Sequence, residues 1–296
     1  MNAKPFVKWA GGKTQLLASI QKNYPSELGK SITRYCEPFV GGGAVFFDVI
    51  SKYKLKKVLI NDINQDLINT YSQIKYDVNA LIHELENLQS AFWPLTTEKR
   101  KEFFYDKRDR FNHIKANRKK AAKLEKATLF IFLNKTCFNG LFRVNRQGFF
   151  NVPMGAYKKP TICDKQNLLS ISSLLQNVTI QCADYQNCLS FIDKNTFVYV
   201  DPPYRPLTAT ASFTAYTENP FDDNEQLALG KFVDKLHHIG AKIVISNSDP
   251  QNSDKRDTFF DDLYSAYQIS RVSAKRMINR SAENRGNINE LLISNY

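Results

Sequence analysis

Short apolar runs recur along the chain, and each ends on polar or glycine-rich residues, which predicts buried β-strands. The first run, residues 35–40, continues into three glycines and a helical pattern from Ala44, and the second covers residues 57–62. The remaining runs cover residues 177–182, 197–200, 242–246 and 290–294. Strands that alternate with helical patterns favour an α/β fold with a mostly parallel sheet.

The alternation breaks off between about residues 65 and 160. Residues 66–74 and roughly 80–126 have helical patterns, and residues 134–160 combine asparagine, glycine, arginine and aromatic residues, which predicts a β-hairpin or an ordered loop. We therefore expect a sheet domain built from residues 1–64 and 161–296, interrupted by a mainly helical subdomain over residues 65–160.

The charge of the chain favours a polyanionic partner. Forty-one basic residues against 29 acidic ones give a formal net charge of +12, so nucleic acid is the first candidate and a membrane surface the second. A merely basic protein has the same composition, however. The densest run of cations contains Lys107, Arg108, Arg110, Lys115, Arg118, Lys119, Lys120, Lys123 and Lys126. This run, and the basic stretch 275–287, present either a solvated surface or a phosphate-contacting one.

Other features narrow the class of protein. With 296 residues, 43% of them hydrophobic, the chain can bury a sizeable core. No apolar run approaches the roughly 18 residues of a membrane span, and the first residues lack the apolar stretch of a secretory signal. Five cysteines without a CxxC pair fit reduced thiols, so we expect a cytoplasmic protein. The histidines lack the spacing of metal ligands, and no metal is expected.

Residues 8–14 read KWAGGKT, which ends like a nucleotide-binding P-loop. A P-loop needs a preceding strand and a glycine five positions before the Gly-Lys pair. That position is Val7, and only a few residues precede it. A P-loop ATPase is therefore a weak alternative.

Three predicted strands end in residues suited to ligand binding, and open α/β sheets bind ligands beyond the carboxyl ends of their strands. Residues 37–43 read EPFVGGG, Asp62 is placed to bind both hydroxyls of a ribose, and residues 201–204 read DPPY. Each has a simpler explanation as a turn, a helix cap or a strand terminator. Their occurrence in order, at successive strand ends, favours a ligand site.

The motifs KWAGGK, EPFVGGG, the Asn61-Asp62 pair, FNGLFRVN and VDPPY, in this order, resemble those of the Dam/DpnII-type DNA adenine-N6 methyltransferases. The resemblance runs from about residue 5 to residue 296 and includes residues 212–216. It implies a Rossmann-like S-adenosylmethionine-dependent methyltransferase sheet, and it makes the inserted helical subdomain, with its β-hairpin, the target-recognition part.

The resemblance implies S-adenosylmethionine as the cofactor. Asp62 matches the acid that binds the ribose, and Asp184 matches the residue that accepts from the adenine amino group. The other residues that match cofactor contacts are Trp9, Ala10, Gly11, Gly12, Lys13, Glu37, Pro38, Phe39, Gly41, Gly42, Gly43 and Asp201.

The resemblance assigns the chemistry to Asp201, Pro202, Pro203 and Tyr204. The exocyclic amine of adenine is a poor nucleophile because its lone pair is delocalised into the ring. Acceptors at the Asp201 carboxylate and the Pro202 carbonyl would draw the amine toward tetrahedral geometry, while Tyr204 stacks on the base. The sulfonium is already an activated donor, so positioning should contribute most of the catalysis.

An adenine in a duplex must be flipped out before it can react. Arg143 matches a guanine-reading arginine, Phe138 an aromatic residue that inserts into the base stack, and Lys8 a lysine that approaches a guanine. The other residues that match DNA contacts are Asn139, Gly140, Leu141, Asn151, Pro153 and Tyr157. The implied partner is double-stranded DNA that contains GATC.

Two further functions share parts of this pattern: an RNA adenine-N6 methyltransferase, and a catalytically silent DNA-binding protein on the same scaffold. The recognition block FNGLFRVN argues against the first, and the intact DPPY argues against the second. We expect a monomer in a bacterial cell or a phage-infected host, and pairing with a restriction endonuclease is one option for its biological role.

Overall fold

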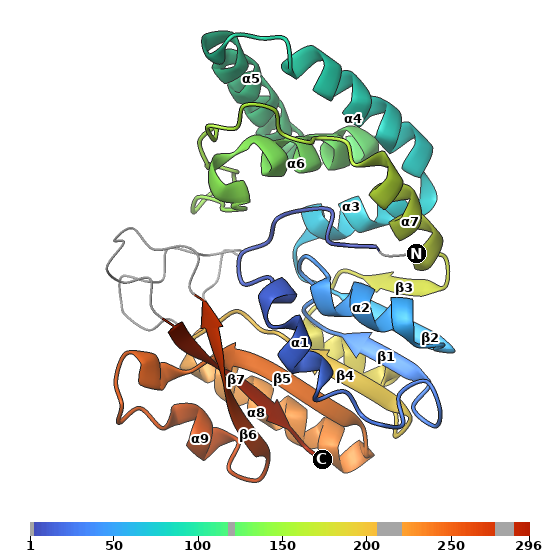
Figure 1. Cartoon of the computed structure of the whole chain (residues 1–296), viewed down its shortest axis with the longest axis vertical. Helices are drawn as coiled ribbons and strands as arrows, with labels where there is room; N and C mark the ends of the chain where they lie inside the picture. The colour runs from blue at the N-terminus through green and yellow to red at the C-terminus, as the bar shows by residue number, and fades with distance from the viewer. Residues whose placement is uncertain (1–2, 118–121, 206–220, 276–286) are drawn as a thin grey trace.

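The computed structural model describes residues 3–117, 122–205, 221–275 and 287–296 (Figure 1). Three stretches singled out in the sequence lie outside these residues: the cations at 118–120, the matched stretch 212–216, and most of the basic stretch 275–287. Within the described ranges, no helix has both the length and the apolar character needed to cross a membrane.

Seven strands form one sheet in the order β3-β2-β1-β4-β5-β7-β6. Their bounds are β1 (Arg34–Glu37), β2 (Lys57–Asn61), β3 (Val178–Gln181), β4 (Thr196–Val200), β5 (Lys242–Ser248), β6 (Gln268–Lys275) and β7 (Asn287–Ser294). The five strands from β3 to β5 are parallel, and β7 runs antiparallel between β5 and β6. The mostly parallel sheet is confirmed. The apolar runs missed β6, because in this edge strand Ile269 and Val272 are separated by polar residues instead of forming a continuous apolar run.

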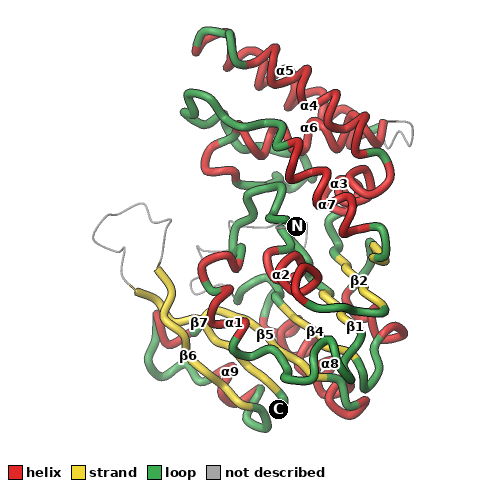
Figure 2. The backbone as a smooth tube through the Cα atoms, turned by 45° about the vertical axis from the view of Figure 1, so that its right-hand side comes forward, coloured by secondary structure: helices red, strands yellow, loops and turns green. Residues whose placement is uncertain are grey.

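Helices cover both faces of the sheet (Figure 2). On one face lie α1 (Leu17–Gln21), α2 (Ala44–Lys52), α3 (Gln65–Tyr76) and α7 (Lys165–Leu175), and on the other lie α8 (Asp223–Ile239) and α9 (Phe259–Leu263). Successive residues of a strand serve different faces: Tyr35 packs in the first apolar core and Cys36 in the second. A strand buried on both faces explains why the parallel strands read as continuous apolar runs.

The helices α4 (Val78–Phe92), α5 (Thr97–Ala116) and α6 (Lys123–Thr136) stand beyond one end of the sheet in Figure 1. All residues from Ala127 to Asn134 are buried, so α6 is the central helix of this helical block. Its aromatic side chains, such as Phe130 and Phe132, belong to the same apolar core as α3, α7 and one face of the sheet. The block therefore packs on the sheet body through a continuous core.

After α6 the chain forms a short 3-10 turn, η3 (Phe138–Gly140), and a folded-back loop. Two isolated antiparallel bridges close this loop, Cys137 with Met154 and Val144 with Phe150. The β-hairpin expected here is present in this reduced form, without a named strand in the described residues. Phe150 is buried in the helical block, which ties the loop to the core.

Candidate active site

The strand order reverses between β1 and β4, which is the point at which open α/β sheets bind ligands. A cavity of about 2610 Å³ opens at the carboxyl ends of these strands. Its lining brings together the residues matched to the cofactor and to the chemistry: 9–13, 37–43, Asp62, Asp184 and 201–204. The cavity also reaches Lys8 and Phe142, whereas Phe138, Asn139, Gly140, Leu141, Arg143, Asn151, Pro153 and Tyr157 do not line it.

Asp201 follows β4, and one oxygen of its carboxylate is fixed by two neighbours. Lys13 Nζ lies 2.7 Å from Oδ1, and Ser246 Oγ donates to the same oxygen at 2.9 Å. Because the single Ser246 proton points at Asp201, the Tyr199 hydroxyl, 2.9 Å away, donates to Ser246. The second oxygen, Oδ2, accepts no hydrogen bond from the described residues. Asp201 thus presents one open acceptor to the cavity.

The next residues add a second open acceptor and a ring. Within the described part of the chain the Pro202 carbonyl has no hydrogen-bond partner, while the Pro203 carbonyl accepts from the buried Gln226 amide at 3.0 Å. The Tyr204 hydroxyl donates to Glu290 on β7, and Lys13 Nζ lies 4.6 Å from the centre of the Tyr204 ring. Glu290 and Lys13 therefore hold the ring from two directions.

Lys13 follows Gly12 in η1 (Lys13–Gln15), and only 4% of Lys13 is exposed. Besides Asp201, its ammonium contacts the Gly11 carbonyl at 2.7 Å. No strand precedes it in the described residues, so the P-loop arrangement is absent there. Burying a lysine ammonium is costly unless an anion lies beside it, so the pair with Asp201 explains how Lys13 can be buried.

Burial raises the pKa of Asp201 above its ordinary value, while the Lys13 ammonium and the Ser246 hydroxyl lower it. Glu37, at the end of β1, is 2% exposed, and its pKa is raised well above the usual range chiefly by burial. Tyr35 Oη donates to Glu37 at 2.5 Å, which opposes that rise. Burial also raises the pKa of Glu290. The buried Lys13 ammonium thus contacts Asp201 and also lowers the pKa of Glu37 and of Glu290 by its charge.

The glycine loop after β1 packs tightly on its own neighbours. Gly41 and Gly43 adopt left-handed φ values of 47° and 74°. A Cβ at Gly41 would lie 2.9 Å from the Trp9 ring, and one at Gly43 would lie 2.5 Å from the Tyr71 hydroxyl. At these positions Trp9 and Tyr71 occupy the space that a side chain would take. The loop backbone, with Phe39, still lines the cavity.

Asp62 is held in place by backbone N–H groups. Gly41 N donates to Oδ2 at 3.0 Å and Asn64 N donates to Oδ1 at 2.9 Å. Burial nevertheless raises the pKa of Asp62. The next residue, Ile63, is 57% exposed and lines the cavity, so an uncovered apolar side chain lies beside the carboxylate.

Asp184 follows β3 and is exposed. Its carboxylate accepts from Gln186 N at 2.9 Å, and it caps the 3-10 segment η4 (Tyr185–Phe191). The buried Asn61 side chain connects the neighbouring loops, since it donates to the Pro38 and Ala183 carbonyls at 3.0 Å each. The loops that end three strands therefore have fixed relative positions.

The residues matched to DNA contacts lie mainly in the loop after α6. Phe138 is 52% exposed, and Asn139 beside it has a left-handed φ of 55°. Arg143 is exposed, and its Nε donates to Asn151 Oδ1 at 2.9 Å. Leu141 is partly buried and Pro153 is exposed. An exposed aromatic ring and an exposed guanidinium in one loop suit contact with a flat or charged partner.

Lys8, in the N-terminal segment, packs against this loop. Its Nζ contacts the Tyr157 hydroxyl at 3.0 Å and lies 4.4 Å from the centre of the Tyr157 ring. A Cβ at Gly140 would lie 2.4 Å from Lys8 Cδ, so the lysine stem crosses the glycine backbone. The structure thus brings Lys8, Gly140 and Tyr157 together.

Much of the basic run in α5 and α6 is ion-paired within the protein. Lys115 and Lys126 both contact the buried Asp66 carboxylate, at 2.8 and 3.1 Å. Arg110 forms a two-pronged pair with Glu125 at 2.6 and 2.7 Å. These contacts give the cations a structural role, while Lys123 is exposed.

The motifs did not single out several residues of the site. Glu290, Gln226 and Ile63 contact or flank the matched residues, yet each stands in or beside a strand or helix where it reads as an ordinary polar or apolar position. Ser246 belongs to the family-like run 245–247, but the sequence assigned it no role. One signal was available: a Glu, a Ser and a Gln are unusual as buried residues and suggest hydrogen-bond partners.

Comparison with known proteins settles the class of the chain. Residues 9–278 match the family model described as D12 class N6 adenine-specific DNA methyltransferase. The chain belongs to this family. The resemblance drawn from the motifs, the methyltransferase fold and the enzyme class are therefore confirmed: the protein is a DNA adenine-N6 methyltransferase.

Individual relatives are similar over nearly the full chain. The type II methyltransferase M.MjaIII of Methanocaldococcus jannaschii is 51% identical, and the alignment covers 100% of both chains. The type II methyltransferase M1.LlaDCHI of Lactococcus lactis subsp. cremoris is 36% identical over 100% of this chain and 96% of its own. A DNA adenine methylase of Vibrio cholerae is 35% identical over 98% of this chain and 95% of its own.

Proposed function

We propose that this methyltransferase transfers a methyl group from S-adenosylmethionine to the N6 amine of adenine at GATC in double-stranded DNA. The observation that carries the chemistry is the pair of open acceptors after β4, Asp201 Oδ2 and the Pro202 carbonyl, in the cavity that Tyr204 also lines. An amine with two hydrogens needs two acceptors to direct its lone pair.

The cavity has features that fit S-adenosylmethionine. Asp62 presents a carboxylate held by two backbone N–H groups, which suits a diol, and Ile63 offers an apolar surface beside it. Phe39 and Asp184 line the same cavity and are available to a purine. We propose that residues 37–43 wrap the methionine and adenosyl parts and that residues 9–13 enclose the cofactor. When bound, the cofactor supplies an activated methyl group.

We propose that the protein's own groups act mainly by positioning. Asp201 Oδ2 and the Pro202 carbonyl accept the two amine hydrogens, and the limited access of water to these acceptors strengthens both hydrogen bonds. Tyr204, fixed by Glu290 and Lys13, stacks on the flipped base. Pro203, whose carbonyl Gln226 holds, keeps the turn rigid. The Lys13 ammonium lowers the pKa of Asp201 against the effect of burial, and so favours the carboxylate, which is the stronger acceptor.

We propose that residues 65–160 form the target-recognition subdomain and that residues 1–64 and 161–296 form the catalytic one. Lys8, Arg143 and Phe138 are the proposed contacts with the site, because all three are exposed: Arg143 and Phe138 lie in the loop after α6, and Lys8 packs against that loop. Asn139, Gly140, Leu141, Asn151, Pro153 and Tyr157 shape the surface around them. The monomeric state, the cytoplasmic location and pairing with a restriction endonuclease stay predictions.

Methyl transfer from labelled S-adenosylmethionine to three nucleic acids tests the proposal. We expect strong labelling of a GATC duplex, and background labelling of a duplex with that site scrambled and of structured RNA. Equal labelling of the two duplexes would refute the GATC site, and a preference for RNA would refute the DNA substrate. Modified-base sequencing of DNA from cells that express the protein would then read the methylated site directly.

A further inference from the structure

Two buried asparagines hold the N-terminal segment to the helices by contacts of the same kind. Asn167 in α7 accepts from Lys4 N and donates to the Lys4 carbonyl, both at 3.0 Å. Asn134 in α6 accepts from Lys8 N and donates to the Lys8 carbonyl, both at 2.8 Å. Each side-chain amide thus satisfies both backbone polar groups of one lysine, as a neighbouring strand would.

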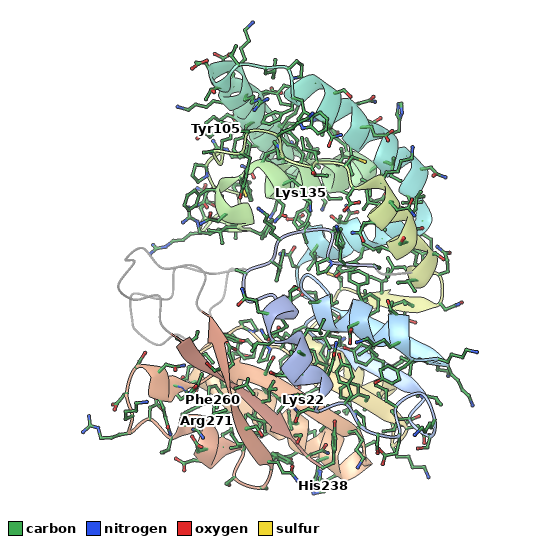
Figure 3. All side chains as sticks on the ribbon, in the orientation of Figure 1. Lys22, Tyr105, Lys135, His238, Phe260 and Arg271 are labelled. Atoms are coloured by element: carbon green, nitrogen blue, oxygen red, sulfur yellow. The ribbon has the colours of Figure 1, made fainter. Side chains whose placement is uncertain are left out.

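Asn134 makes a third contact. Its Nδ2 also donates to the Gly140 carbonyl at 2.9 Å, and only 1% of Asn134 is exposed. Within the described residues the Asn167 side chain has no such third partner. Figure 3 labels Lys135, the next residue along α6, on the lower side of the helical block in that view. Asn134 therefore ties the backbone at residue 8 to the loop at residue 140.

The contact sets the geometry of a lysine that the motifs match to a guanine contact. With its backbone held by Asn134, Lys8 extends across Gly140 and ends against Tyr157. Gly140 has a left-handed φ of 65°, and the residues that follow it include Arg143. The segment with Lys8 is 126 residues distant from α6 in sequence, so it has no covalent reason to keep this spacing.

We propose that Asn134 is a positioning residue for DNA recognition. Its carboxamide fixes the spacing between Lys8 and the loop 138–143, so that both parts contact the same base pairs in one docking arrangement. Base readout by hydrogen bonds tolerates only small displacements of the side chains that make them. The inference rests on the proposed function, in which Lys8 and Arg143 read the site.

The test compares Asn134→Ala with the matched control Asn167→Ala. The ratio of kcat/KM for a GATC duplex to that for an AATC duplex is measured for each folded variant, and cofactor affinity is measured by calorimetry. We expect Asn134→Ala to lower the ratio by roughly tenfold, the scale of one base contact. Asn167→Ala should leave the ratio unchanged, although it too loses a buried amide with two backbone contacts. Both variants should keep cofactor affinity.

A double-mutant cycle with Lys8→Ala separates positioning from general destabilisation. If Asn134 acts through Lys8, Asn134→Ala should lower the ratio no further once Lys8 is alanine. An equal further loss in that background would overturn the proposal, as would equal ratios for the Asn134→Ala and Asn167→Ala variants.

A second variant covers the case in which Asn134→Ala does not fold. Asn134→Asp keeps the side-chain volume and the acceptor for Lys8 N, but it replaces the donor that serves the Lys8 and Gly140 carbonyls. It should lower the ratio as well, and an unchanged ratio would overturn the proposal. The wild-type ratio is measured first: an enzyme that methylates DNA but does not distinguish GATC from AATC contradicts the proposed site itself, which is a different failure.

Discussion

Lys13 and Asp201 at the carboxyl edge of the sheet are largely shielded from solvent and contact each other through their side chains, whereas Lys8, a proposed DNA-reading residue beside the loop after α6, is exposed and its backbone is held by a buried side chain. Asp201 is fixed by Lys13 and Ser246. Lys8 is fixed at its backbone by Asn134, and its charged end remains exposed.

The difference follows from what each region must bind. A group that meets a reacting atom works best where water is excluded and the dipoles around it are already oriented. A group that reads a base must reach beyond the protein surface, so neighbouring side chains cannot enclose it. The position of such a group is therefore set by the backbone segment that carries it. Each substitution below alters one of the two regions and is compared with a matched control substitution.

The largest effect is expected at Asp201. Asp201→Ala removes the open acceptor, so kcat should fall by at least about 10²-fold while cofactor and DNA binding remain. Single-turnover methylation and calorimetry measure the two properties. The control is Asp249→Asn, since Asp249 is a buried, arginine-paired carboxylate at the end of β5 that does not line the cavity. Normal methylation by the Asp201→Ala variant would show that its carboxylate has no catalytic role.

Arg143→Ala tests the exposed region. Loss of a bidentate contact with guanine should remove roughly 1–3 kcal/mol of discrimination between GATC and near-cognate duplexes, without lowering cofactor affinity. Arg146→Ala is the matched change, because Arg146 is an exposed arginine three positions on in the same loop. A competition assay in which both variants lose discrimination equally would indicate a general charge effect and remove Arg143 from the readers.

A smaller effect is expected at Glu290, which accepts from the Tyr204 hydroxyl. Glu290→Ala frees the ring, and kcat should fall by roughly tenfold, about the worth of a hydrogen bond to a charged group. Glu290→Gln keeps an acceptor at the same place and should recover most of the rate. If the Gln variant is as slow as the Ala variant, the rate depends on the charge of Glu290 and not on its hydrogen bond with the Tyr204 hydroxyl.

Lys13→Met should change the pH dependence of methylation. Asp201 accepts a hydrogen bond most strongly as a carboxylate, so activity should fall as the pH falls through its pKa. The Lys13 ammonium lowers that pKa, and its removal raises the pKa further, so the acidic limb of the pH–rate profile should move to higher pH. Lys4→Met, which breaks an exposed lysine–aspartate pair, should leave the profile in place. Calorimetry would show whether Lys13 also contributes to cofactor affinity.

The sequence predicted the central parallel strands well because β1, β2, β4 and β5 are buried on both faces and therefore rich in apolar residues. It missed β6, an edge strand whose few apolar residues are scattered among polar ones, as in an exposed loop. The motifs located the ends of β1, β2 and β4, since the residues at each strand end are contiguous. The hairpin was predicted as a type of element, but its reduction to two isolated bridges depends on packing against α5 and α6.

By itself, the sequence determined the α/β class, the order of the strand-end motifs and the family, because these depend on residues that are neighbours in the chain. Only the tertiary structure decided which side chains hold the motif residues in place. Glu290 is 86 residues from Tyr204, and Asn134 is 126 residues from Lys8. Partners at such distances are brought together by the burial of the apolar core, and no local pattern records them. The stretch KWAGGKT illustrates the difference. Its residues suggested a phosphate-binding loop, but in the folded protein Lys13 contacts Asp201 and Lys8 contacts Tyr157.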